Sequence, residues 1–344
     1  MIPAPYLVYI GHSTDPLGIK TSRGVAEFRR ADCLGEFRHD DSPLTLDLPR
    51  LGMAEAAEAG ARTLILGIAG AGGKVGADLI EDAAAALAAG MHVASGLHER
   101  LRDQPRLAAL AAERGLQLFD VRDPPAGLVV GKGVPRAGRR LLTVGTDCSV
   151  GKMYATLALT EGLRARGIAA DFRATGQTGI LIAGDGIAVD AVVADFISGA
   201  IERLAPARDD DGWDLIEGQG SLFHPSFAGV SLGLLHGAQP DALVLCHEPG
   251  RPHLRGIEGR PLPGLAECLA RNLEAARLTR PDVRAVGICL NTSGMERSAA
   301  LALCAATEAE AGLPCTDPIA FGVDAILDRL LCLERSTRSA TISR

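Results

Sequence analysis

The sequence predicts an α/β protein in which an N-terminal Rossmann-like domain is followed by a doubly wound, P-loop NTPase-like domain built on a parallel sheet. Three observations support this prediction. Short apolar runs alternate with stretches of helical periodicity, a proline- and glycine-rich stretch divides them into two series, and a glycine-rich loop with a lysine joins a strand to a helix in the second series. With 344 residues the chain can form two domains, which we expect at residues 1–130 and 138–344.

The first series alternates strands with helices, as a small parallel sheet requires. The predicted strands are Tyr6 to Ile10, Thr63 to Ile68, Met91 to Ser95 and Leu116 to Val121, and the predicted helices are Ala54 to Ala59, Ala77 to Ala89 and Arg106 to Arg114. Polar loops follow two of these strands, at residues 12–24, which include Lys20 to Gly24, and at 95–98. Ligands gather beyond the carboxyl ends of parallel strands, although capping of the loops explains these residues nearly as well.

A second glycine-rich loop, residues 67–76, follows the second predicted strand. It departs from the dinucleotide-binding pattern G-x-G-x-x-G because Val75 takes the place of the last glycine. We interpret it as a tight turn. Prolines and glycines then recur between residues 125 and 138, which indicates a domain boundary.

The second series supplies six strands and five helices, typical of a doubly wound sheet. The predicted strands are Leu141 to Val144, Ala169 to Arg173, Asp214 to Ile216, Ala242 to Cys246, Ala285 to Leu290 and Ile319 to Phe321. The predicted helices are Lys152 to Arg166, Ile187 to Leu204, Leu262 to Ala276, Met295 to Ala311 and Val323 to Leu333.

The stretch LLTVGTDCSVGKMYA, residues 141–155, carries the strongest functional signal. A strand, a glycine loop and a helix N-terminus present backbone N–H groups to a phosphate, and a lysine adds a positive charge. The phosphate-binding residues would be Gly145, Thr146, Asp147, Cys148, Ser149, Val150, Gly151, Lys152 and Met153. Met153 stands where a Ser or Thr hydroxyl normally holds Mg²⁺, so we expect phosphate binding and no metal site.

Loops after the neighbouring strands should open toward the bound anion. Glu217 and His224 follow the third strand of the second series and His247 follows the fourth, so these three side chains are candidate general bases. Other polar residues of these loops are candidate substrate contacts: Arg173, Gln177, Thr178, Gln219, Ser221, Arg251, Arg255 and Asn291. Arginines form bidentate pairs with carboxylates, which favours an acidic substrate, although a solvated basic loop explains Arg251 and Arg255 as well.

The composition excludes several classes of partner. The net charge of −7 and pI of about 5.7 argue against nucleic acid or an anionic membrane as the main partner. The eight cysteines form no CxxC pair, which fits free thiols in a reducing compartment. No apolar run reaches the roughly 18 residues of a membrane span, and the N-terminus lacks the basic start of a signal peptide. We therefore expect a cytoplasmic protein, and we expect it to be a homo-oligomer.

Two resemblances follow from these motifs. The run GTDCSVGK, the strand end at Arg173 to Gly176 and IEGQGSL resemble the corresponding loops of dethiobiotin synthetase, although Met153 departs from that family's Thr. GTDCSVGKM, FRATGQTG, AVDAVVADFISGAIE, EGQGSLFHP, KTSRG and SGLHERL together resemble a two-domain P-loop family, formerly of unknown function, typified by D-glutamate N-acetyltransferase. The second resemblance spans nearly the whole chain.

The second resemblance implies acetyl transfer from acetyl-CoA to the amino group of D-glutamate, and a partner enzyme that acts on the N-acetylated product. Coenzyme A carries phosphates that need no metal-assisted cleavage, which agrees with a P-loop that lacks its Mg²⁺ hydroxyl. Two alternatives stay open at this point. One is an ATP- and Mg²⁺-dependent ligase or kinase of the dethiobiotin synthetase type, with Glu217 and Asp147 on the metal, and the other is a nucleotide-binding regulator without turnover.

Overall fold

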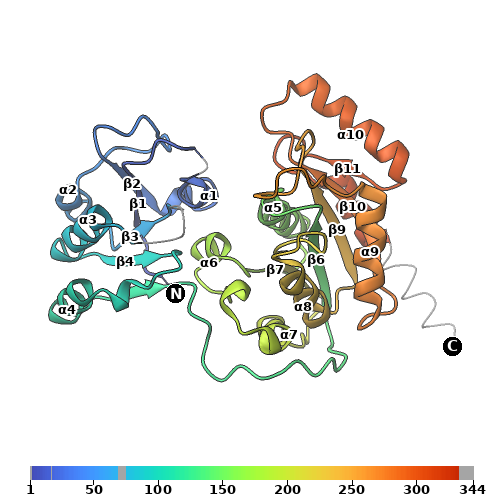
Figure 1. Ribbon diagram of the computed structural model, residues 1–344, viewed down its shortest axis with the longest axis horizontal. Helices are drawn as coiled ribbons and strands as arrows, with labels where there is room; N and C mark the ends of the chain where they lie inside the picture. Colours follow the sequence, from blue (N-terminus) through green and yellow to red (C-terminus); the bar gives the residue numbers. More distant parts are fainter. Residues whose placement is uncertain (1, 17, 69–74, 333–344) are drawn as a thin grey trace. The chain divides into compact units, whose positions relative to one another are not determined.

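The computed structural model describes residues 2–16, 18–68 and 75–332. The chain divides into two compact units (Figure 1): the first is Met1–Pro124 with Gly176–Ala191, and the second is Pro125–Thr175 with Val192–Arg344. Each unit contains one sheet, and all the strand pairs in both sheets are parallel. The predicted fold class is confirmed.

The first sheet has the strand order β2-β1-β3-β4-β5. Its strands are β1 (Tyr6–Gly11), β2 (Cys33–Arg38), β3 (Thr63–Leu66), β4 (His92–Ser95) and β5 (Leu118–Asp120). Four of them match the predicted strands, and β2 was not predicted. The three predicted helices are confirmed as α2 (Met53–Glu58), α3 (Ala77–Ala88) and α4 (Pro105–Arg114), and their apolar side chains form one buried cluster with those of β1, β3 and β4.

Two further helices of the first unit pack against each other. Helix α1 (Lys20–Phe28) begins inside the stretch that the sequence analysis took as a polar loop, so that part of the prediction was wrong. Helix α6 (Gln177–Ala183) comes from a distant part of the chain, yet the Thr178 and Thr21 hydroxyl oxygens lie 2.7 Å apart. The second glycine-rich loop, at 67–76, lies largely outside the described residues, since 69–74 are not among them.

The second sheet has the strand order β11-β10-β9-β6-β8-β7. Its strands are β6 (Arg139–Gly145), β7 (Ala170–Arg173), β8 (Trp213–Ile216), β9 (Ala242–His247), β10 (Arg284–Leu290) and β11 (Cys315–Thr316). Five of them match predicted strands. The prediction of a strand at Ile319 to Phe321 was wrong, because the Asp317 carboxylate accepts the N–H groups of Ile319 and Ala320 and fixes a turn there.

Helices cover both faces of the second sheet. Helix α5 (Lys152–Ala165) and the helix at 324–332 share a buried apolar cluster with one face, while α8 (Ala228–Ala238) and α9 (Leu265–Arg277) contact β6, β9 and β10. Helix α10 (Arg297–Ala311) lies beside β11. The predicted single helix from Ile187 to Leu204 was wrong: two short 3₁₀ turns precede α7 (Ile197–Leu204). None of the helices within the described ranges is long and apolar enough to cross a bilayer.

Glycines let α7, α8 and the stretch before β6 approach one another closely. A Cβ atom at Gly199 would lie 1.8 Å from the Val129 carbonyl oxygen, and one at Gly237 would lie 2.4 Å from the Ser198 carbonyl oxygen. A Cβ atom at Gly229, also on α8, would meet nothing within 4 Å. These two helices therefore contain both a glycine that packing requires and one that it does not.

We expect Gly199→Ala to lower the free energy of unfolding by about 1–3 kcal/mol, because its methyl group would displace the backbone at Val129. Gly229→Ala is the matched control and should raise that free energy by up to about 1 kcal/mol, since alanine is the better helix former. Urea denaturation of both variants measures the difference. Equal effects of the two substitutions would contradict the close approach.

Candidate functional site

The carboxyl ends of β6, β8 and β9 bring three loops to one edge of the second sheet. Strand β6 pairs with β8 on one side and with β9 on the other, so that Leu142 lies opposite Ile216 and Gly145 opposite Cys246. The P-loop, residues 145–153, follows β6. The loop after β8 begins at Glu217, and the loop after β9 begins at Glu248. Side chains from the second and third loops therefore surround the P-loop, as the predicted topology requires.

The P-loop forms a concave row of backbone N–H groups. Ser149 and Gly151 have φ angles of +54° and +96°, which turn successive peptide planes toward the start of α5. The N–H groups of residues 149–153 have no acceptor among the described residues. Free donors at the positive end of a helix favour the binding of a phosphate or another anion.

The side chain of Lys152 turns back into the P-loop. It is buried, and its Nζ donates to the Asp147 carbonyl oxygen at 2.7 Å. Burial lowers the pKa of Lys152, because a low-dielectric surrounding disfavours the charged ammonium. A bound anion would supply the counter-charge that favours the ammonium form.

The loop after β8 packs directly on the strand that leads to the P-loop. The Gly218 N–H donates to Thr143 Oγ1 at 3.0 Å, and a Cβ atom at Gly218 would lie 1.8 Å from the Thr143 carbonyl oxygen. Only glycine permits this approach. Thr143 was not predicted as a site residue, because a threonine in an apolar strand is an ordinary β-sheet residue.

Asp147 connects the P-loop to the loop after β9. Its buried carboxylate accepts the Cys148 N–H at 2.7 Å, the Arg255 N–H at 2.8 Å and Nη1 of Arg251 at 2.8 Å. Arg251 also donates to the carbonyl oxygens of Cys148 and Ser149 and pairs with Glu248. The guanidinium of Arg255 donates to Ser149 Oγ. Arg251 and Arg255, two of the three arginines predicted as substrate contacts, therefore lie against the P-loop.

The three candidate bases differ in how their polar atoms are used. Glu217 is buried and accepts the Thr175 N–H at 2.9 Å. His224 is buried, its Nδ1 accepts the Ser226 N–H at 3.2 Å, and its Nε2 therefore donates to the Arg255 carbonyl oxygen at 3.0 Å. Both ring nitrogens of His224 are occupied.

His247 keeps one nitrogen available. Its Nδ1 lies 2.9 Å from the Thr146 hydroxyl, and its Nε2 has no hydrogen-bond partner among the residues that the structure describes. Burial, together with the charge of Arg251, lowers the pKa of His247 below its ordinary value of 6.5. The imidazole is therefore neutral at pH 7 and can accept a proton.

The remaining predicted substrate contacts are divided between the two units. Arg173 is held by Asp214, with its Nη2 at 2.7 Å, and by Asp171. Gln177 and Thr178 belong to α6 of the first unit.

Three more of these residues lie at the edge of the second sheet. Gln219 donates to Thr175 Oγ1 at 3.2 Å, and Ser221 Oγ donates to the Thr146 carbonyl oxygen at 3.1 Å. Asn291 stands beside the P-loop, because a Cβ atom at Gly151 would lie 3.7 Å from its own.

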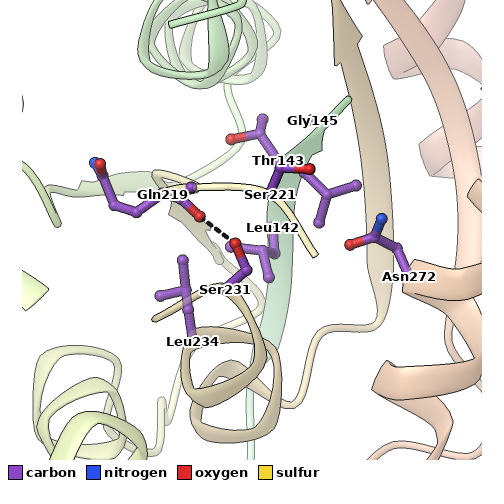
Figure 2. Close-up of a pocket in the computed structure, with 10 residues that line it drawn as sticks. Leu142, Thr143, Gly145, Gln219, Ser221, Ser231, Leu234 and Asn272 are labelled. Atoms are coloured by element: carbon purple, nitrogen blue, oxygen red, sulfur yellow. Dashed lines mark hydrogen bonds between the residues drawn. The ribbon is translucent and has the colours of Figure 1, made fainter. Parts of the chain in front are cut away.

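A small cavity with room for about one water molecule lies beneath the P-loop strand (Figure 2). Ser231 of α8 lines it and donates to the Gln219 carbonyl oxygen at 2.7 Å, and Asn272 lines it from α9. Neither Ser231 nor Asn272 was predicted as a site residue from the sequence. Asn272 is a buried polar residue on an otherwise apolar helix face, which is the one signal that could have identified it.

Two family models match the chain. Residues 129–327 match a family model described as a domain of unknown function, DUF1611_C, P-loop domain, and residues 37–124 match DUF1611_N, Rossmann-like domain. The chain belongs to the DUF1611 family. A DUF1611 family protein from Anabaena variabilis has a similar crystal structure, with a TM-score of 0.87, 35% sequence identity, and coverage of 96% of this chain and 99% of the other.

Two curated relatives of this DUF1611 protein carry a functional name. One from Pseudoalteromonas sp is 46% identical over 329 residues, and one from Tritonibacter scottomollicae is 46% identical over 330 residues. Each similarity covers 96% of this chain and 99% of the relative, and each relative is named D-glutamate N-acetyltransferase. The predicted family membership is confirmed.

We expect Lys152→Ala to weaken the binding of coenzyme A by roughly 10- to 150-fold, because it removes one charge-assisted hydrogen bond of about 1.5–3 kcal/mol. The melting temperature should change little, since burial of this ammonium has its own cost. Lys132→Ala, at an exposed residue before β6, is the matched control. Calorimetric titration measures both, and an unchanged dissociation constant for Lys152→Ala would contradict the assigned anion site.

Proposed function

We propose that this DUF1611 protein is an N-acetyltransferase that moves the acetyl group of acetyl-CoA to the amino group of D-glutamate. The observation that carries the proposal is the similarity, over nearly the full length of both chains, to two relatives named D-glutamate N-acetyltransferase. The site supports it, because a P-loop with Met153 at the metal-ligand position suits a phosphorylated carrier whose reacting bond is not at phosphorus. The acetyl donor and the site residues are part of the proposal.

In this proposal the free N–H groups of residues 149–153 bind a phosphate of the coenzyme, and Lys152 contacts the same group. The pantetheine arm between the phosphates and the sulfur is long and flexible. It has to fold back over the strand ends for the thioester to reach a base beside the P-loop. A coenzyme bound in a bent conformation is therefore an implication of this assignment.

His247 is the best placed of the three candidate bases. Its neutral imidazole keeps Nε2 available, whereas the Thr175 N–H occupies Glu217 and both nitrogens of His224 are engaged. His247 takes a proton from the substrate ammonium, and the free amine attacks the thioester carbonyl. A C–N bond forms and the C–S bond breaks. Coenzyme A leaves as a thiolate that takes up the proton lost by the acylated nitrogen, and His247 releases its own proton to solvent.

The oxyanion of the tetrahedral intermediate needs hydrogen-bond donors. The Gly218 N–H is used by Thr143, but the N–H groups of residues 219–221 have no acceptor among the described residues and are available for this purpose. For the carboxylates of glutamate, we assign Arg255 and Asn291, which border the P-loop. Arg173 is committed to Asp214 and is the weakest of the arginine candidates.

An ATP-dependent ligase or kinase is the second candidate, because the second unit has the phosphate-binding loop of such enzymes. Release of free thiol from acetyl-CoA with D-glutamate, measured beside phosphate release from ATP, separates the two activities. We expect thiol release from acetyl-CoA in the presence of D-glutamate and no phosphate release from ATP. Phosphate release from ATP without thiol release from acetyl-CoA, with D- and L-amino acids alike, would contradict the acetyltransferase and favour the ligase or kinase.

The proposed base predicts a pH dependence. Since the pKa of His247 is lowered below 6.5, the imidazole is deprotonated above that pKa and kcat/KM should fall as the pH drops through it. His247→Gln should lower kcat by about 10²- to 10⁴-fold and remove this acidic limb. His253→Gln, in the same loop, is the control and should keep wild-type rates. A limb that persists in His247→Gln would assign the proton to another group.

A further inference from the structure

Three side chains with metal-binding chemistry meet at the P-loop. One ligand atom each of Asp147, Cys148 and His224 lies within 4.8 Å of the other two. A carboxylate, a thiol and an imidazole are a set that would suit Zn²⁺ or Co²⁺. The described contacts of these residues indicate, however, that a different cation serves Asp147.

That cation is the guanidinium of Arg251. Its Nη1 lies 2.8 Å from Asp147 Oδ2 and 2.6 Å from the Cys148 carbonyl oxygen, and its Nη2 lies 3.0 Å from the Ser149 carbonyl oxygen. Asp147 is fully buried and the Arg251 side chain is 15% exposed, so the pair is largely shielded from water. A buried carboxylate needs such a partner, because an unpaired buried charge is costly.

The contacts of Arg251 also explain the shape of the P-loop. A peptide plane has its carbonyl oxygen and its N–H group on opposite sides. Holding the carbonyl oxygens of Cys148 and Ser149 toward the guanidinium therefore turns the N–H groups that follow them to the opposite side. The N–H groups turned in this way are those of Ser149 and Val150, the first two of the free donors at residues 149–153.

We propose that Arg251 is a built-in cation that neutralises Asp147 and preorganises the P-loop, in the role that a bound divalent metal ion would otherwise serve. Arg251 is then a positioning residue and does not contact the reacting atoms. The inference rests on the proposed assignment of the P-loop to a coenzyme phosphate. It goes further, because it says what keeps the loop in its binding conformation.

The other two members of the cluster, Cys148 and His224, differ in their contacts. The Cys148 Sγ lies within 4.8 Å of an Asp147 carboxylate oxygen, so a metal ion that took the place of Arg251 could contact both. Both nitrogens of His224 have hydrogen-bond partners within the protein. With Arg251 in place, the Asp147 carboxylate is already paired, and removal of Arg251 should leave Asp147 and Cys148 as a vacant cation site.

The test uses Co²⁺ alone as the probe, because thiolate ligation of Co²⁺ produces a charge-transfer absorption in the near ultraviolet. We expect no such band when Co²⁺ is added to the wild-type protein and a band at one equivalent with Arg251→Gln. The band should disappear when Cys148→Ser or Asp147→Asn is added to Arg251→Gln. Arg260→Gln, an exposed arginine of the same loop, is the matched control and should resemble the wild type.

A second measurement is the affinity for coenzyme A in the presence of EDTA. Arg251→Gln should weaken binding by about tenfold, the equivalent of one net charge-assisted contact, and Arg260→Gln should leave it unchanged. If Arg251→Gln does not fold because Asp147 is left unpaired, the double variant Asp147→Asn with Arg251→Gln is neutral at both positions. It should fold, bind coenzyme A about tenfold more weakly, and bind no Co²⁺.

Two results with Co²⁺ would overturn the inference. One is a wild-type protein that binds Co²⁺ through Cys148 as tightly as Arg251→Gln does, and the other is an Arg251→Gln protein that shows no charge-transfer band with Co²⁺. Unchanged affinity of Arg251→Gln for coenzyme A in EDTA would do the same. The Co²⁺ measurement requires neither coenzyme nor acetyl transfer. Failure of the proposed function and failure of the built-in cation are therefore distinguishable.

Discussion

The turn between β6 and α5 is the constraint on which the candidate site depends. It leaves the N–H groups of residues 149–153 without acceptors in the described protein, and such groups are stable only where water or an anion can reach them. The neighbouring contacts all serve this turn. Gly218 packs on the strand before it, Lys152 donates back to the Asp147 carbonyl oxygen, and Arg251, paired with Asp147, fixes the direction of its carbonyl oxygens by donating to those of Cys148 and Ser149.

The elements that sequence periodicity identified are those buried on one face or fully buried within a sheet. Strands β6, β9 and β10 contain the apolar stretches 141–144, interrupted only by Thr143, 242–246 and 285–290, and such stretches have few alternatives to a central parallel strand. Helix α8 was missed for the opposite reason. It contacts both α7 and α9 and is apolar and glycine-rich around its circumference, so it shows no helical period.

The P-loop was predictable because its function depends on backbone donors, and glycine spacing records a backbone path. The roles of the arginines were not predictable in the same way. Arg173 is separated by 41 residues from its partner Asp214, and Arg251 by 104 residues from Asp147. Nothing in the local sequence distinguishes an arginine that binds a substrate carboxylate from one that neutralises a buried aspartate. That distinction depends on long-range contacts, which only the folded chain reveals.

The path of the chain at α6 has a consequence for how this protein can be divided. The chain leaves the second unit after β7, contributes residues 176–191 to the first unit, and returns, so the two units are joined by three connections. A fragment ending at Pro124 would lack α6 and uncover the surface of α1 on which it packs. Recombination or domain exchange at the proline-rich linker would therefore separate α1 from its partner helix α6. We therefore expect the two domains to be inherited as one unit.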